Sequence, residues 1–226
     1  FLFFQIITIN SVFSQSIKKA YRHYDKNEFE KLEETLIKLD ERSSENSGKY
    51  YLYSLLYLKN KEDREKLKIA YQNILNSQRN YLNQDAKDLE ELSDLKITLK
   101  SIDSVKNIID SLEYEFVKDK NSIEEYKSYI DYYINSKFKN DAVKRWHSLE
   151  YEIVSNQNSW EGYKIFMDEF PSSQYYHMAK ELYEKLIFEE KTKNNSINSF
   201  EDFIAKYPDT PYRDSIEFTL LKKYTV

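Results

Sequence analysis

This 226-residue chain has three histidines, His23, His147 and His177, whose side chains could bind a metal or move a proton near neutral pH. None of them stands in a His-Glu-x-x-His pattern, which places two zinc ligands on one helix face. The chain has no cysteine to serve as a nucleophile or a thiolate ligand. We therefore expect surface or half-buried histidines, and we predict no catalytic residue, no metal ligand and no cofactor-binding residue.

Other catalytic patterns are missing from the sequence as well. Phosphate-binding loops and Gly-x-Ser-x-Gly elbows need clustered glycines, whereas Gly48 and Gly162 stand alone. The 39 acidic residues are dispersed among 34 basic ones, so we interpret them as solvated helix faces. The net charge of −5 and the lack of a basic stripe argue against a nucleic-acid partner.

The composition favours long helices. The chain has only 2 glycines and 3 prolines, too few for the many tight turns of an all-β protein. Its length suits one domain or two small ones. These helices must position whatever surface the protein uses.

A repeat of 37 residues is the strongest pattern in the chain. Asn-Ser pairs begin at Asn121, Asn158 and Asn195, and aligning the sequence on them matches eight apolar positions without a gap. These positions are Ile123/Trp160/Ile197, Tyr126/Tyr163/Phe200, Tyr129/Phe166/Phe203, Ile130/Met167/Ile204, Tyr133/Phe170/Tyr207, Phe138/Tyr175/Tyr212, Ala142/Ala179/Ile216 and Trp146/Tyr183/Leu220. We expect three copies of one structural unit.

Each unit reads as two helices joined by a bend. The apolar positions of the first half recur at helical spacing, and Ser159 or Asn158 can cap its start. Pro171 and Pro208 should end the first helix, because proline disfavours the helical conformation at the residue before it. Ser136, Ser173 and Thr210 are then placed to cap the second helix. Each pair needs a neighbour to bury its open face.

The pattern aromatic-x-x-aromatic-aliphatic-x-x-aromatic-Pro-x-Ser/Thr-x-Tyr-x-x-x-Ala runs through residues 163–179 and 200–216, and loosely through 126–142. It resembles the tetratricopeptide-like repeats of bacterial envelope proteins, such as outer-membrane assembly lipoproteins and periplasmic division coordinators. The resemblance implies an all-α, right-handed solenoid of antiparallel helix hairpins and a scaffold role. The chain departs from the family in its period, in the Ile134 that replaces the first proline, in Ile216 and in lacking a lipid-attachment cysteine.

The first half of the chain also has helical spacing, but it is less regular. We expect helices over residues 17–24 and 29–39, a loop at 42–48 that contains Gly48, and a buried helix over 50–58, for which a strand is the alternative. A break at 83–85 precedes a leucine-rich stretch, 92–116, that could form one long helix or two. The expected organisation is an irregular helical half at 15–120 and three helix hairpins at 121–226.

Residues 1–14 resemble the end of a secretory signal peptide, with an apolar run that closes at Val12 and Ser14. The alternatives are an uncleaved anchor and a buried first helix. A signal peptide implies a periplasmic or secreted protein of the cell envelope.

The chain contains 21 tyrosines, and most of those at repeat positions should lie in the core. Tyr132, Tyr151 and Tyr176 lie outside the aligned positions, and we expect them to form a partner groove on an exposed face.

The function predicted from these patterns is a non-enzymatic scaffold that binds another protein or peptide, and that associates with the outer membrane through such a partner. One alternative is an accessory module of a larger exported enzyme or membrane-anchored protein. A second is an enzyme in its own right, which a deep pocket with converging polar groups would favour.

Overall fold

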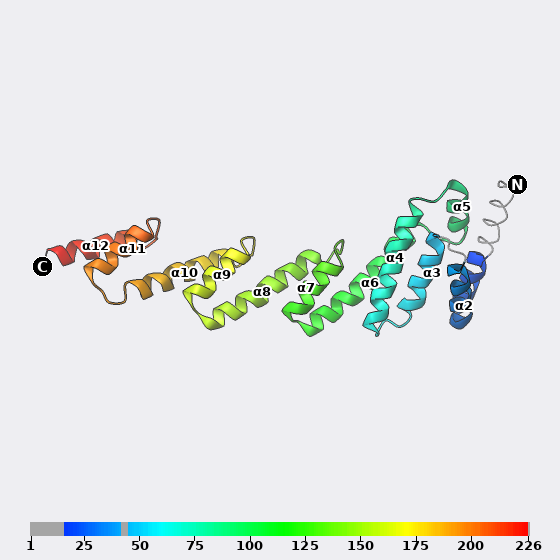
Figure 1. Ribbon diagram of the computed structural model, residues 1–226, viewed down its shortest axis with the longest axis horizontal. Coiled ribbons are helices and arrows are strands. Elements are labelled where there is room, and N and C mark those ends of the chain that lie inside the picture. Colours follow the sequence, from blue (N-terminus) through cyan, green and yellow to red (C-terminus); the bar gives the residue numbers. More distant parts are fainter. Residues whose placement is uncertain (1–15, 42–44, 226) are drawn as a thin grey trace. The chain divides into compact units, whose positions relative to one another are not determined.

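The computed structural model describes residues 16–41 and 45–225, which form helices joined by short turns, with no strand among them (Figure 1). The predicted all-α fold is confirmed. The chain divides into two compact units, one before and one from Asn121. The predicted signal peptide at 1–14 lies outside the described residues.

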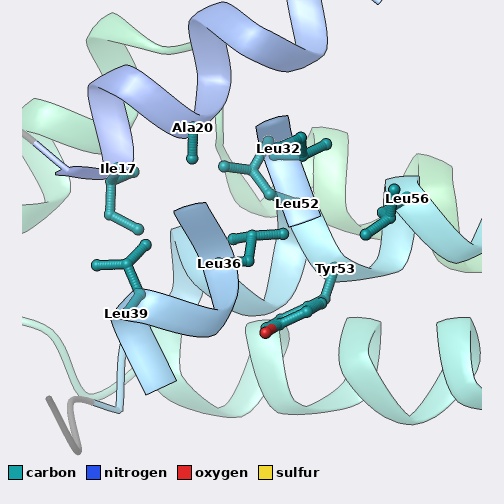
Figure 2. Close-up of a cluster of buried hydrophobic side chains, with 8 residues drawn as sticks. All are labelled: Ile17, Ala20, Leu32, Leu36, Leu39, Leu52, Tyr53 and Leu56. Atoms are coloured by element: carbon teal, nitrogen blue, oxygen red, sulfur yellow. The ribbon is translucent and has the colours of Figure 1, made fainter. Parts of the chain in front are cut away.

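The first unit is built from helices of unequal length. They are a helix over residues 16–25, α2 (Phe29–Asp40), α3 (Ser47–Leu58), α4 (Arg64–Tyr81), α5 (Ala86–Asp94) and α6 (Leu99–Lys120). Helix α3 packs on α2, on α4 and on α6, so the apolar run at 50–58 is a central buried helix as predicted. One core cluster of this unit joins the first three helices (Figure 2), and it consists of Ile17, Ala20, Leu32, Leu36, Leu39, Leu52, Tyr53 and Leu56.

The predicted loop at 42–48 is wrong at its end, because α3 already begins at Ser47. Asn46 caps the helix by accepting hydrogen bonds from the amides of Gly48 and Lys49. A Cβ at Gly48 would lie 2.8 Å from Leu92 Cδ2 and 3.1 Å from Ile17 Cγ2. The glycine therefore permits close packing inside the core, and it does not mark a loop.

The leucine-rich stretch at 92–116 forms two helices. The break predicted at 83–85 separates α4 from α5, and a second break at Leu95–Thr98 separates α5 from α6. Lys96 adopts the left-handed conformation with φ 58°, and the Ile97 amide donates back to the Leu92 carbonyl at 2.9 Å. This closing turn satisfies carbonyls at the end of α5.

The second unit repeats one pair of helices. The first helices are α7 (Ile123–Tyr132), α9 (Trp160–Glu169) and α11 (Ile197–Lys206), and the second helices are α8 (Lys139–Gln157), α10 (Tyr176–Lys191) and α12 (Arg213–Tyr224). Within each set the helices begin 37 residues apart. Each helix packs on the next along the chain, from α7 to α12.

The Asn-Ser pairs are the junctions between successive helix pairs. Asn121, Asn158 and Asn195 all adopt the left-handed conformation, with φ of 47°, 46° and 53°. Asparagine tolerates this conformation better than most residues, so it turns the chain at the end of a helix. The following serine then caps the next helix, as Ser159 does by accepting a hydrogen bond from the Gly162 amide at 3.1 Å. Of the two caps predicted for α9, Ser159 is therefore the one used.

Pro171 and Pro208 lie in the bends between paired helices, as predicted. The predicted caps of the second helices are wrong in position. The Ser173 hydroxyl accepts from the Tyr175 amide at 3.2 Å, one residue before α10 begins, and Ser136 and Thr210 do the same in the other bends. These hydroxyls hold the turn that leads into the helix.

Over the residues the structure describes, no helix is both long and apolar enough to cross a lipid bilayer.

Candidate interaction surface

The three histidines lie in different settings. His23 Nδ1 is 2.6 Å from Glu28 Oε2, and His177 is exposed on α10. His147 is buried, unlike the surface or half-buried side chain predicted, because its ring packs 4.9 Å from that of Phe170. Burial lowers the pKa of His147, although Glu150 opposes the shift. No group of three potential metal ligands occurs in the part of the chain that the structure describes.

The predicted tyrosine groove is wrong for Tyr151. Tyr132 is exposed at the end of α7 and Tyr176 is half-buried at the start of α10, but Tyr151 is a core residue with 9% exposure. The three side chains therefore do not form one exposed face.

Tyr151 is buried because it joins two helix pairs. Its ring stacks on Tyr175 with centroids 4.6 Å apart and lies edge-on to Phe166 at 5.5 Å. The contact between successive helix pairs, which we call a joint, recurs 37 residues later. There Phe188 stacks on Tyr212 at 4.4 Å and lies edge-on to Phe203 at 5.4 Å. In the third helix pair the residue equivalent to Tyr151 and Phe188 is Thr225. The sequence alignment therefore does not identify this position as aromatic.

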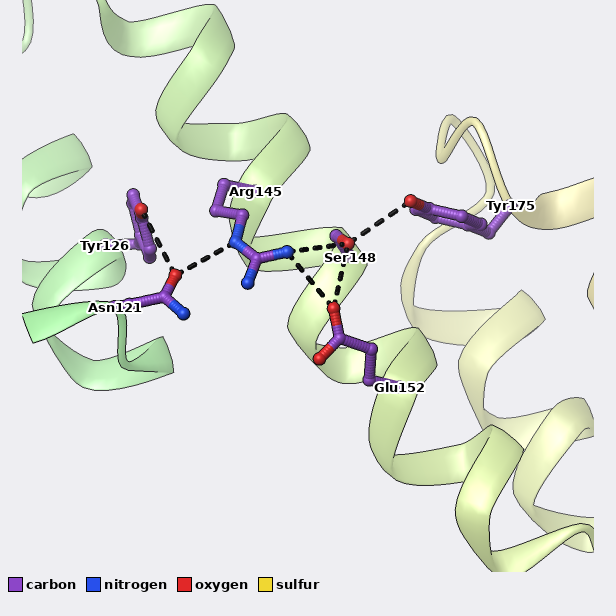
Figure 3. Close-up of polar contacts among 6 residues, drawn as sticks. All are labelled: Asn121, Tyr126, Arg145, Ser148, Glu152 and Tyr175. Atoms are coloured by element: carbon purple, nitrogen blue, oxygen red, sulfur yellow. Dashed lines mark hydrogen bonds and ion pairs between the residues drawn. The ribbon is translucent and has the colours of Figure 1, made fainter. Parts of the chain in front are cut away.

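A polar network lies at the joint between the first two helix pairs (Figure 3). Arg145 Nε donates to Asn121 Oδ1 at 2.9 Å, and Arg145 Nη1 donates to Ser148 and Glu152 at 3.2 and 3.1 Å. The Ser148 hydroxyl lies 3.2 Å from the Tyr175 hydroxyl, so α8 is connected to the residue before α10. These contacts hold the junction before α7 and the stacked Tyr175 in place.

The joint between α8 and α9 is filled by large side chains. Trp146 lies edge-on to Phe170 at 5.4 Å, and His147 packs beside it. The Trp146 Nε1 group donates to Glu150 at 2.9 Å. Phe170 is buried as a result.

The corresponding joint between α10 and α11 is open. Tyr183, Glu184 and Tyr207 stand where Trp146, His147 and Phe170 stand in the previous joint. A hollow of about 330 Å³ remains there, which we name the α11 hollow. Its lining residues are Lys180, Tyr183, Glu184, Ile187, Phe203, Lys206, Tyr207, Pro208, Asp209 and Thr210. Tyr183 is smaller than Trp146, and Glu184 is charged where His147 packs on Phe170, so this contact between helix pairs is less completely filled than the previous one.

The α11 hollow combines an apolar floor with a charged rim. Ile187 and Phe203 are buried at its base, and the exposed Lys180, Lys206 and Asp209 lie around it. Burial raises the pKa of Tyr183, so its hydroxyl stays protonated and can donate a hydrogen bond at neutral pH. A second hollow of about 300 Å³ shares Phe203, Lys206 and Tyr207. The arrangement suits an apolar side chain of a bound segment, with polar contacts at the edge.

No protein-family model matches this chain, and no curated protein matches it significantly.

Proposed function

We propose that this protein is a non-enzymatic scaffold of the bacterial envelope, built from tetratricopeptide-like helix pairs, that holds another protein or peptide. The observation that carries the proposal is the α11 hollow. It lies in a unit of recurring helix pairs, and such arrays commonly present binding surfaces made by several units.

Two features support peptide binding in this hollow. Its floor is apolar and partly aromatic, so a bound leucine or phenylalanine would remove apolar surface from water at both partners. Its rim carries both signs of charge, with Lys180 and Lys206 beside Glu184 and Asp209, so polar groups of a peptide backbone or side chain find donors and acceptors. A mixed rim of this kind favours selectivity for one charge pattern.

Export to the envelope is proposed from the sequence of residues 1–14 and from the resemblance of the repeats. The second candidate is an accessory module of a larger exported enzyme or membrane-anchored protein. The gene sequence on both sides of the region that encodes this chain separates the two, because a catalytic or membrane domain encoded there favours the accessory module. Fractionation of cells that express the tagged reading frame tests export, and recovery in the cytosol alone contradicts it.

The binding test uses a charge reversal at the rim. The Lys180→Glu/Lys206→Glu double variant changes two exposed side chains of the hollow and leaves the apolar floor intact. A partner captured from an envelope fraction is purified, and its affinity for the chain is measured by calorimetry. We expect the double variant to raise the Kd about tenfold, which corresponds to a loss of about 1.4 kcal/mol in binding free energy.

The matched control is Lys164→Glu/Lys185→Glu. These lysines are also exposed, on α9 and α10, and do not line the α11 hollow. The control should bind as the original chain does. Equal loss in both variants, or the absence of any purified protein that binds directly, contradicts the proposal.

A further inference from the structure

The network around Arg145 shows how a helix pair of this chain holds a guanidinium group. The Arg145 side chain leaves α8 and lies between Asn121, at the junction before α7, and Glu152, further along α8 (Figure 3). Its Nε donates to Asn121 Oδ1 at 2.9 Å, and its Nη1 donates to Glu152 Oε1 at 3.1 Å. An amide oxygen and a carboxylate thus hold one guanidinium group in the first helix pair.

The second helix pair keeps both acceptors but has no arginine between them. Asn158 and Glu189 stand 37 residues after Asn121 and Glu152. The residue equivalent to Arg145 is Leu182, which packs against the apolar core of this pair and carries no charge. The Lys185 ammonium is 4.0 Å from the Glu189 carboxylate, farther than the 3.1 Å between Arg145 and Glu152. The two acceptor positions are therefore present without the cation that they bind one unit earlier.

A hollow of about 530 Å³ lies at these acceptors, and we name it the Trp160 hollow. The residues that line it include Asn158, Trp160, Glu161, Glu189, Glu190 and Lys193. Three exposed carboxylates thus stand against one ammonium group, so the lining is net negative. Glu190 takes the place of Ile153 in the first pair, which adds one of these carboxylates. The charge of the lining complements a positively charged group.

Trp160 adds a surface that suits a planar cation. The equivalent residue of the first pair is Ile123. The Lys191 ammonium lies over the Trp160 ring, 5.2 Å from its centroid, so the face of this indole already attracts a cation. A guanidinium group is flat and more weakly hydrated than an ammonium, and it can stack on the indole while its edge donates to carboxylates. The hollow therefore favours a guanidinium over an ammonium.

We propose that the Trp160 hollow binds an arginine side chain of a partner protein. The occupant is specified by the first helix pair, where the same two acceptor positions hold an arginine of the chain itself. The guanidinium of the partner donates to the Asn158 amide oxygen and to the Glu189 carboxylate, and it stacks on Trp160. Glu161 and Glu190 increase the attraction at the rim.

This inference rests on the proposed scaffold function for the nature of the partner, and it names one chemical group of that partner. The Trp160 hollow and the α11 hollow share no lining residue. The test uses a small probe in place of a captured protein. It can therefore fail while charge reversal at Lys180 and Lys206 still weakens partner binding, and it can succeed when that reversal has no effect.

The probe is N-acetylarginine amide, in which the backbone is neutral as it is within a protein chain. The chain has two tryptophans, so the indole Nε1–H signals of Trp160 and Trp146 report separately on the hollow and on the joint in an NMR titration at constant ionic strength. The Trp160 signal should shift along a saturable curve with a Kd of about 10 mM, because exposed ion pairs are individually weak. No saturable shift at about ten times this concentration overturns the proposal.

Three related probes define the ligand. N-acetylcitrulline amide has nearly the same shape without the charge and should give no saturable shift. N-acetyllysine amide should bind with a Kd about threefold higher, because an ammonium lacks the planar fork of donors. Equal affinity for the lysine probe would make the hollow a general cation site and would overturn the proposal. Tighter binding of free arginine than of N-acetylarginine amide would assign the hollow to the amino acid and would also overturn it.

Variants of the hollow test the two acceptors. Asn158→Gly removes the amide and suits the left-handed backbone of the junction, and Glu189→Gln removes the charge with little change of shape. Each should raise the Kd of N-acetylarginine amide about threefold. The matched control is Glu181→Gln, which is also exposed on α10 but does not line the hollow, and it should leave the Kd unchanged.

A variant that improves binding excludes a folding defect as the cause. Lys193→Gln removes the only positive charge among the lining residues and should lower the Kd about twofold. A higher Kd in this variant, or an unchanged Kd in both Asn158→Gly and Glu189→Gln, contradicts binding of a cation at these acceptors.

Discussion

The ring of Tyr151 lies face to face on the ring of Tyr175, with centroids 4.6 Å apart and planes 9° from parallel. Phe188 and Tyr212 repeat the arrangement at 4.4 Å and 8°. Each stack joins the second helix of one pair to the bend of the next, so it fixes how successive pairs meet. Stacked aromatic pairs contribute to stability beyond the area that they bury.

Replacement of Tyr151 by alanine should destabilise the second unit by about 3–4 kcal/mol, because it removes a buried ring and leaves a cavity. Tyr151→Phe keeps the stack and should cost much less. Both tryptophans, Trp146 and Trp160, lie in the second unit, so urea unfolding followed by tryptophan fluorescence isolates that unit. A loss for Tyr151→Ala no larger than that for the exposed Tyr132→Ala would contradict the stacking role.

The left-handed asparagines give a second prediction. Asn158→Ala should destabilise the second unit by about 1 kcal/mol, because a Cβ without a compensating side chain is disfavoured at φ 46°. Asn158→Gly should be neutral or stabilising, since glycine adopts this conformation freely. The midpoint of urea unfolding by tryptophan fluorescence measures both. Equal effects of alanine and glycine would show that conformation is not what this position requires.

A buried ion pair in the first unit gives a third prediction. Glu113 is 1% exposed, and its Oε1 accepts from Arg64 Nε at 2.5 Å, so α6 is tied to the start of α4. Glu113→Ala leaves a partly buried guanidinium without this carboxylate and should cost about 2–3 kcal/mol. The first unit contains no tryptophan, so circular dichroism should detect the shift while tryptophan fluorescence does not. A shift in both signals would falsify the assignment to the first unit.

His147 gives the fourth prediction, a dependence of stability on pH. Burial lowers its pKa in the folded chain, so below the ordinary histidine pKa of 6.5 the unfolded chain takes up a proton that the folded chain resists. The stability that neutral His147 provides is therefore complete above pH 6.5 and falls as the pH drops toward the folded value.

Replacing His147 with glutamine removes this titration. Between pH 7 and 5 the tryptophan-monitored stability of His147→Gln should change less than that of the original chain. His177→Gln, an exposed change on α10, is the control and should follow the original profile. Parallel profiles for all three proteins would exclude His147 as the source.

Local chemistry in the sequence predicted the helices and their bends well. Pro171 and Pro208 act on their immediate neighbours through the backbone, and Ser159 caps the helix that follows it directly. These constraints need no knowledge of distant residues.

Features that depend on distant contacts could not be predicted in the same way. Gly48 resembles a loop residue until Ile17 and Leu92 are placed against it. At the position equivalent to Tyr151, the third helix pair has Thr225 in place of an aromatic residue. The alignment alone therefore does not place Tyr151 in the core. The α11 hollow forms because Tyr183 and Glu184 do not fill the space that Trp146 and His147 fill in the previous joint. This difference depends on how the side chains pack in the folded chain, so the sequence does not reveal it.

Helix α12 contributes one buried residue, Ile216, to the described structure. Few contacts must break for this helix to open, so its amide hydrogens should exchange with solvent before those of α9 and α10. Arg213, Lys222 and Lys223 then become accessible to trypsin. Cleavage at these three residues should therefore precede cleavage within α9 and α10.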